Sequence, residues 1–210
     1  MKHRKMNKNE QGNEMQNDQQ LELSADEILE ALPDVAMSNL SGINSYYIKT
    51  KKDLDKFSKG IEYNDLWTNK SDDDIKDNIP QLLALGLKHT VTDFFRNISQ
   101  PRINPEFFGS DNHLTKEMRV MLYRCIRELV NNVVKHANAK YIFVKLSTHT
   151  NNVSVVVHDN GTGFDPESVT IGLGLGNIAN YIISQNGIMA IHTEYGKNTE
   201  ISINIELNHD

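Results

Sequence analysis

Two glycine-rich segments follow one another in the C-terminal half of the chain and limit what it can fold into. DNGTGF occupies residues 159–164, just after an apolar run at residues 153–157, and GLGLGN occupies residues 172–177. Glycines at this spacing permit a tight turn and let a ligand come close to the backbone. The pattern therefore predicts a strand, a turn and a helix that begins beside a binding site.

The segments around these glycines predict a two-layer α/β sandwich. Residues 115–138 carry an apolar stripe with helical spacing, and residues 177–184 form a second predicted helix. Residues 141–146 and 153–157 flank a polar turn and predict an antiparallel hairpin, as do residues 187–193 and 200–207. In this order, the helices are expected to cover one face of a mixed sheet.

The predicted helix 115–138 also carries polar residues with a chemical character. Glu128, Asn132, Lys135 and His136 stand at i, i+4, i+7 and i+8, which would bring them to one face of an α-helix. The amide oxygen of Asn132 suits Mg²⁺, and Glu128 can orient or deprotonate an attacking group. Lys135 can meet phosphate charge. Taken alone, a solvated helix face explains the same residues equally well.

The residues in the glycine-rich segments suit a nucleotide. Asp159 follows a strand, where a buried carboxylate can accept a hydrogen bond from an exocyclic amine. Gly172 and Gly174 open a helix, where backbone N–H groups and the helix dipole favour phosphates. A Rossmann-like turn is the alternative, but no parallel βαβ unit surrounds these glycines.

Three blocks in this order resemble the signature boxes of the ATPase family shared by histidine kinases, gyrase and heat-shock chaperones. The blocks are Glu128-x3-Asn132, Asp159-x-Gly161-x-Gly163 and Gly172-x-Gly174-x2-Asn177. The string RELVNNVVKHA at residues 127–137, the short stretch between the last two blocks, and LGL at residues 85–87 are similar to sensor histidine kinases that act on LuxR-type response regulators.

The resemblance implies a site for ATP and Mg²⁺. On the phosphate side, it implies that Asn132 binds Mg²⁺, that Glu128 assists phosphoryl transfer, and that Lys135 and His136 lie by the phosphates. Gly172, Gly174 and Asn177 would then belong to a mobile lid over the phosphates.

The same resemblance implies an adenine side. There, Asp159 would contact the adenine amine, Gly161 and Gly163 would make room for the base, and Thr199 would close the site. The family usually has a glycine just before this threonine, and the chain has Asn198 instead. Asn tolerates positive φ, so the turn is expected to survive.

The N-terminal half predicts a different organisation. Residues 1–23 are almost all polar and are expected to be disordered, whereas residues 24–95 are expected to form a helical hairpin and linker before an ATP-binding domain at residues 96–210. The first predicted helix starts with a capping box at Ser24 and Glu27, is interrupted by Pro33, and ends near Lys51. A weaker second helix spans residues 53–70.

The apolar stripes of this hairpin need a partner. Pairing with a second copy would make a homodimer through a four-helix bundle. Packing against the chain's own C-terminal domain is the alternative, and periodicity alone does not separate the two.

The first helix lacks the residue that the resemblance leads one to expect. In those kinases a phospho-accepting histidine followed by an acidic residue lies in a segment similar to residues 32–41, where this chain has Pro33-Asp34. No histidine stands between His3 and His89. Ser38 occupies the place of a glutamine used in dephosphorylating the partner. Autophosphorylation at the usual site is therefore not expected.

Three functions remain open from the sequence. The favoured one is a histidine-kinase-type enzyme of two-component signalling that transfers or senses the γ-phosphate of ATP to control a response regulator. The second is a catalytically degenerate module that binds ATP and dimerises without autophosphorylation. The third is a small serine kinase acting on an anti-sigma antagonist, but such kinases lack a preceding hairpin, so residues 24–95 argue against it.

Composition excludes other classes of function. The chain has 22 Lys+Arg against 28 Asp+Glu, a net charge of -6, which predicts no nucleic-acid partner. No apolar run approaches the roughly 20 residues that span a bilayer. The single cysteine, Cys125, lies in an apolar helical pattern and is expected to be a buried thiol. We therefore expect a cytoplasmic protein.

Overall fold

The described part of the chain forms a mixed sheet with helices on one face. The computed structural model describes residues 43–58, 80, 84–165 and 173–207. Within them, six strands hydrogen-bond in the order β1-β5-β6-β4-β3-β2. Only β2 (Arg102–Gly109) and β3 run parallel among these neighbours, and the other pairs are antiparallel. The predicted fold class, a mixed sheet in an α/β sandwich, is confirmed.

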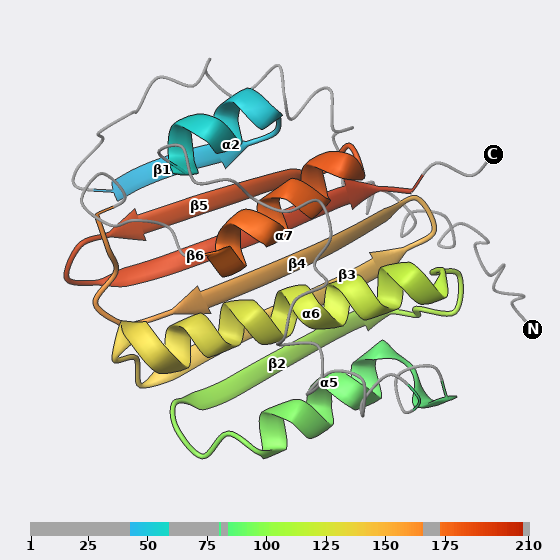
Figure 1. Ribbon diagram of the computed structural model, residues 1–210. Coiled ribbons are helices and arrows are strands. Elements are labelled where there is room, and N and C mark those ends of the chain that lie inside the picture. Colours follow the sequence, from blue (N-terminus) through green and yellow to red (C-terminus); the bar gives the residue numbers. More distant parts are fainter. Residues whose placement is uncertain (1–42, 59–79, 81–83, 166–172, 208–210) are drawn as a thin grey trace, which may run out of the picture. The chain divides into compact units, whose positions relative to one another are not determined.

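The two predicted hairpins form the middle of the sheet. β3 (Tyr141–His149) turns into β4 (Asn152–Asp159), and β5 (Ile188–Glu194) turns into β6 (Asn198–Glu206). Every second residue of β4 and β6 is buried. The alternation arises because one face of the sheet lies under the helices and the other does not, as Figure 1 shows.

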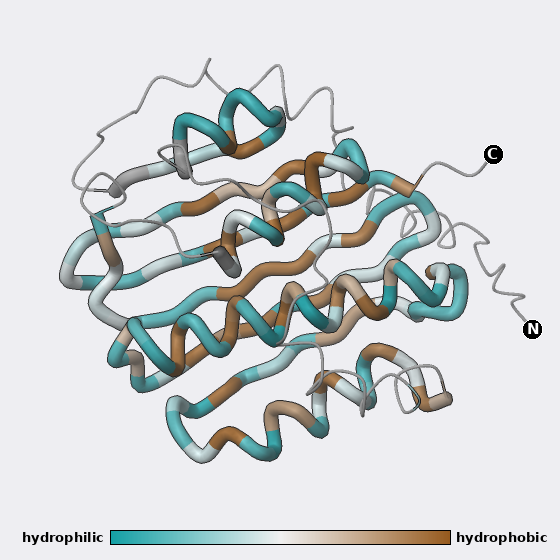
Figure 2. The backbone as a smooth tube through the Cα atoms, viewed as in Figure 1, coloured by the Kyte–Doolittle hydropathy of each residue, from teal (hydrophilic) through white to brown (hydrophobic). Residues whose placement is uncertain are grey.

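Helix α6 (Lys116–Asn132) is the central helix on the covered face. Thr115 caps it by accepting a hydrogen bond from the Met118 N–H at 3.2 Å. Figure 2 shows hydrophobic positions recurring along this helix. Its inward stripe buries Leu122, Tyr123, Cys125, Ile126, Leu129 and Val130. At about 1.5–3 kcal/mol for each fully buried large apolar side chain, this stripe is a major part of the core.

Cys125 lies inside this stripe, as its place in the sequence predicted. Its side chain is completely buried, and burial raises the pKa of the thiol to about 12. A thiol in this environment remains protonated and packs as a small apolar group.

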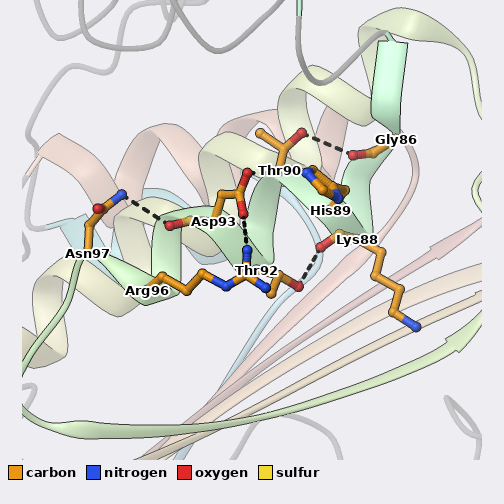
Figure 3. A network of polar contacts seen from close by, with 8 residues as sticks. All are labelled: Gly86, Lys88, His89, Thr90, Thr92, Asp93, Arg96 and Asn97. Carbon is orange, nitrogen blue, oxygen red and sulfur yellow. Dashed lines mark hydrogen bonds and ion pairs between the residues drawn. The ribbon is translucent and has the colours of Figure 1, made fainter.

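Helices α7 (Leu173–Ser184) and α5 (Leu87–Arg96) flank α6. The N-terminus of α5 is capped by a distant side chain, since the Leu87 N–H donates to Asp111 Oδ2 at 2.7 Å. Its outer surface carries short-range polar contacts (Figure 3). There, Asp93 pairs with Arg96 at 2.7 Å and with His89 at 3.3 Å. Such exposed pairs contribute only a few tenths of a kcal/mol each, so α5 depends mainly on its buried face.

The prediction of a helix that ends near Lys51 is wrong for residues 43–48. These residues form strand β1 (Ile43–Ile48) instead. β1 pairs antiparallel with β5, and Ile48 is 1% exposed. The segment is rich in β-branched and aromatic residues, which favour strands, and the open edge of β5 supplies the hydrogen-bond partners. Most of the rest of the predicted hairpin, including Pro33 and Ser38, lies outside the described residues.

Helix α2 (Lys51–Ser58) follows β1 directly and packs on α7. Thr50 and Asp53 form a reciprocal cap: the Thr50 N–H donates to Asp53 Oδ2 at 2.8 Å, and the Asp53 N–H donates to Thr50 Oγ1 at 3.2 Å. Leu54 is completely buried in the main core. Residues 43–58 thus pack against the C-terminal half of their own chain, and dimerisation through a helical bundle remains a prediction.

Replacing Leu54 with Ala is expected to lower the free energy of unfolding by about 2–5 kcal/mol, because it leaves a cavity between α2 and the core. Urea unfolding followed by circular dichroism measures the change. Lys52→Ala, at an exposed position of the same helix, is the control and should change stability by less than about 0.5 kcal/mol. Equal effects of the two substitutions would show that α2 is not part of this core.

Candidate functional site

Several chain segments meet at one end of the strands, at the left in Figure 1. They are the last residues of β4 and β5, the first residues of β3 and β6, and the C-terminal end of α6. Asp159 in β4 stands opposite Thr199 in β6, and Thr199 stands opposite Thr193 in β5. Residues directly opposite on neighbouring strands point to the same face. The three side chains therefore form a row across the sheet, and they are 3%, 7% and 0% exposed.

The carboxylate of Asp159 is the buried acid in this row. Burial raises its pKa above the ordinary 3.8, although the hydrogen bond from Gly161 and the nearby His158 act in the opposite direction. The Gly161 N–H donates to Oδ1 at 2.7 Å, which fixes the orientation of the carboxylate. A carboxylate held in this way, away from water, is suited to accept a hydrogen bond from a donor on a ligand.

Gly161 and Gly163 are required by close backbone approaches. A Cβ on Gly161 would overlap the carbonyl oxygen of Ala137 and lie 2.7 Å from Asp159 Oδ1. Gly163 has φ +56°, and a Cβ there would overlap the carbonyl oxygen of Glu194. The two glycines thus let the loop lie directly on the end of the sheet.

Backbone hydrogen bonds hold this loop on two sides. The Thr162 N–H donates to Ala137 O at 2.8 Å, and the Gly196 N–H donates to Thr162 O at 2.6 Å. Asn160 Oδ1 accepts from the N–H groups of Lys140 and Tyr141 at 3.0 and 2.9 Å. The loop is therefore tied both to the segment after α6 and to the β5–β6 turn.

Glu128 and Gly174 meet between α6 and α7. A Cβ built on Gly174 would overlap Oε1 of the Glu128 carboxylate, so the carboxylate lies against the backbone of the first turn of α7. Glu128 is half-buried. The structure thus brings together one residue from each of two predicted blocks, and it places an acid at a helix N-terminus, where a negative charge is favourable.

The end of α6 differs from the predicted α-helix. Residues 133–137 form a π-helical turn, η1 (Val133–Ala137), immediately after Asn132. The α-helical spacing that placed Lys135 and His136 on one face with Glu128 does not hold across this wider turn. Both side chains are exposed, whereas Asn132 is half-buried. Single π turns inside helices are frequent at functional sites.

The remaining predicted residues lie around these contacts or outside the described part. Asn177 is half-buried in the first half of α7. Thr199 lies in the row beside Asp159. Gly172 lies outside the described residues.

Thr193 was not predicted, and its side chain contacts both the loop and Thr199. Its Oγ1 accepts from the Phe164 N–H at 3.0 Å and lies 3.2 Å from Thr199 Oγ1. The sequence shows a threonine in the strand predicted to pair with the strand of Thr199. Only the strand register places the two threonines opposite each other.

A comparison with protein-family models matches residues 117–209 to the family described as "Histidine kinase-, DNA gyrase B-, and HSP90-like ATPase". The chain carries a histidine-kinase-type ATPase domain. The matched residues include α6, the loop 159–164, α7 and both hairpins of the sheet, so the family match covers the elements that meet at the candidate site.

Curated relatives of this ATPase domain are sensor kinases. The chain is 32% identical over 109 residues to the sensor histidine kinase ComP of Bacillus subtilis, which covers 50% of this chain and 14% of that protein. It is 30% identical over 90 residues to the histidine-protein kinase/phosphatase UhpB of Salmonella typhimurium, which covers 43% of this chain and 18% of UhpB. It is 26% identical over 127 residues to the histidine-protein kinase/phosphatase DegS of Brevibacillus brevis, which covers 59% of this chain and 33% of DegS. The chain thus spans a third or less of the length of these relatives.

Among solved structures, the histidine kinase domain of the blue-light activated histidine kinase of Erythrobacter litoralis EL346 aligns with this chain. The TM-score is 0.47 at 14% identity, covering 57% of this chain and 62% of that one.

Of the helices in the described ranges, none combines the length and apolar character that a bilayer span requires.

Replacing Asp159 with Asn is expected to stabilise the nucleotide-free protein at neutral pH, since an amide keeps an acceptor for the Gly161 N–H without a buried charge. Because burial raises the pKa of Asp159 above 3.8, the folded protein holds this proton more tightly than the unfolded chain. The free energy of unfolding therefore falls as pH rises from 3.8 to the raised pKa, and it stays lower above that value.

Urea titrations at a series of pH values measure this fall, which the Asn variant should lack. Asp55→Asn, which removes an exposed carboxylate from α2, controls for the change in net charge. A wild-type protein and an Asp159→Asn variant with the same pH dependence would contradict the assignment of a buried, desolvated carboxylate.

Proposed function

We propose that the chain binds Mg²⁺-ATP between the end of α6, the loop 159–164 and the start of α7. In this proposal it acts as a histidine-kinase-type enzyme of two-component signalling. The observation that carries the proposal is the Asp159 carboxylate, buried at the end of β4 and oriented by the Gly161 N–H at 2.7 Å. ATP binding accords with the family of the domain, and the residue roles are our inference.

The adenine side is formed by Asp159, Thr199 and the two loop glycines. A buried carboxylate is costly unless its lone pairs receive donors, and the Gly161 N–H serves only one oxygen of Asp159. The exocyclic amine of adenine is such a donor. The backbone at Gly161 and Gly163 leaves no room for side chains, so the loop presents peptide groups to the base.

The phosphate side is formed by α6 and α7. The first turn of α7 presents N–H groups that no helical carbonyl accepts, which suits phosphate oxygens. Asn132 offers one neutral oxygen, and Mg²⁺ usually takes few protein ligands and completes its shell with water and phosphate oxygens. Lys135 and His136 are exposed just beyond Asn132, where they can meet phosphate charge. Gly172 would complete this side.

Glu128 is the proposed catalytic residue. Its carboxylate lies one helical turn before Asn132 and against the backbone of Gly174, between the two helices that would hold the phosphates. ATP supplies the phosphoryl group. The carboxylate would orient the attacking group and accept its proton, a contribution that is typically about 10²–10⁴-fold in rate.

The phosphate acceptor is proposed to lie on another chain, because Pro33 stands where the sequence resemblance places a histidine. The curated relatives are named sensor and signal-transduction histidine kinases, which supports a response regulator as the downstream partner. A homodimer remains part of the proposal. The second candidate is a module that binds ATP and controls its partner without transferring phosphate, and Pro33 is the observation that favours it.

Asn132→Ala is expected to weaken ATP binding in Mg²⁺ by at least about tenfold, because an oxygen ligand of the metal is lost. Binding measured in EDTA should change much less. Isothermal titration calorimetry under the two conditions gives both values. If ATP binds this variant and Asp159→Ala as tightly as the wild-type chain, the site is assigned wrongly.

Glu128→Gln is expected to keep ATP binding near the wild-type level and to lower phosphoryl transfer by about 10²–10⁴-fold. Release of inorganic phosphate from γ-labelled ATP, and labelling of added histidine-bearing partner proteins, measure the transfer. Glu117→Gln, an exposed acid in the first turn of the same helix, is the matched control. Binding of ATP by wild-type protein with no transfer to water or protein would favour the module without transfer.

A further inference from the structure

The hydroxyl of Thr193 has more neighbours within hydrogen-bond distance than it can bond to at the same time. The Phe164 N–H donates to Oγ1 at 3.0 Å. Two carbonyl oxygens, those of Phe164 and Asn198, lie 3.2 and 3.3 Å from the same atom. Thr199 Oγ1 lies at 3.2 Å. The Thr193 side chain is completely buried, so water does not reach its hydroxyl as another hydrogen-bond partner.

A threonine hydroxyl donates one hydrogen bond and accepts two. Carbonyl oxygens only accept, so the single proton of Thr193 serves one of them at a time. If Thr199 donates to Thr193, then Thr193 accepts twice and donates once, and its hydrogen-bonding capacity is filled. In the reverse arrangement, Thr193 donates to Thr199, neither carbonyl receives the proton, and one lone pair of Thr193 is unused.

Buried polar groups favour the arrangement that leaves fewer of them unsatisfied. The arrangement in which Thr199 donates inward to Thr193 is therefore the favoured one. Lone pairs of Thr199 Oγ1 remain for a donor on its other side. Thr199 stands directly opposite Asp159 and points to the same face of the sheet, and the Asp159 carboxylate also only accepts.

We propose that Thr193 is a positioning residue for recognition of the nucleobase. Its buried hydroxyl makes Thr199 a hydrogen-bond acceptor toward the ligand, and it holds the loop at Phe164 against the sheet. Asp159 and Thr199 then present two acceptors side by side, which favours a base with an amino group over a base with a carbonyl group at the same position. This inference rests on the nucleotide site proposed above.

The proposal explains why a buried threonine in β5, which reaches no ligand itself, is tied both to the loop and to β6. Gly163 lies against the carbonyl oxygens of Glu194 and Asn198, so the loop already follows the β5–β6 turn closely. The bond from the Phe164 N–H to Thr193 extends this attachment by one residue. A single hydroxyl thus couples the position of the loop to the direction of the Thr199 proton.

The test compares the binding of ATP with that of ITP, in which a carbonyl replaces the amino group, in the presence of Mg²⁺. The wild-type chain is expected to favour ATP by about tenfold or more, because ITP sets a carbonyl against two acceptors. In Thr193→Val the Thr199 hydroxyl is free to donate, so ATP binding weakens more than ITP binding and the preference falls severalfold. Thr193→Ser keeps the hydroxyl and should restore the preference.

Thr148→Val is the matched control. Thr148 is 4% exposed and its hydroxyl donates to Phe108 O at 3.2 Å, at the opposite end of β3. This variant loses a buried hydroxyl in the same sheet and should keep the wild-type preference. An equal fall in both valine variants would mean that Thr193 is merely structural.

Hydrogen exchange gives a readout that does not depend on ATP. The Phe164 amide should be protected in the free wild-type protein and in Thr193→Ser, and it should exchange faster in Thr193→Val. If Thr193→Val does not fold, Thr193→Cys makes the same comparison with a weak hydrogen-bonding group. An unprotected Phe164 amide in the wild-type chain, or an unchanged ATP preference in the variant, would overturn the inference. A wild-type chain that binds neither nucleotide would instead refute the nucleotide site.

Discussion

The burial of one face of the sheet under α6 and α7 is the constraint on which the rest of the structure depends. Alternate residues of β4 and β6 and the apolar stripe of α6 are buried together in one core. This packing fixes the direction of both helices relative to the strands. The C-terminal end of α6 and the N-terminal turn of α7 then meet where Glu128 contacts Gly174. The core therefore determines which polar groups come together at the site, although none of its apolar residues has a chemical role.

The candidate site gives up stability in order to hold polar groups in place. Asp159 is buried and its pKa is raised, which means that its charged form is disfavoured in the folded protein. Gly161 and Gly163 add backbone freedom to the unfolded chain, and the π turn η1 interrupts a regular helix. Each feature costs free energy, and all of them lie where β4 and α6 end. Such a concentration is expected where a ligand supplies the missing interactions.

The sequence predicted those elements whose patterns are local. Helix 115–138 and both hairpins carry clear periodicity, and the glycine blocks marked the loop and the start of α7. Two strands and one site residue were missed or assigned wrongly because their partners are distant in sequence. β2 (Arg102–Gly109) is a largely exposed edge strand that contains Pro105 and pairs with β3, and β1 has apolar residues that also fit a helix. Thr193 likewise acquires its role only through the strand register and the folded loop.

The position of β1 and α2 shows that the sheet and its core include residues 43–58, which precede the family-matched segment 117–209. β1 covers the edge of β5 with hydrogen bonds, and α2 buries Leu54 against the core beside α7. β5 carries Thr193, and α7 carries Gly174 next to Glu128. Two elements of the candidate site therefore pack directly against residues 43–58. A change in the position of this segment has only one layer of contacts to cross before it reaches the candidate site. The segment is therefore a physical route from the N-terminal half of the chain to that site.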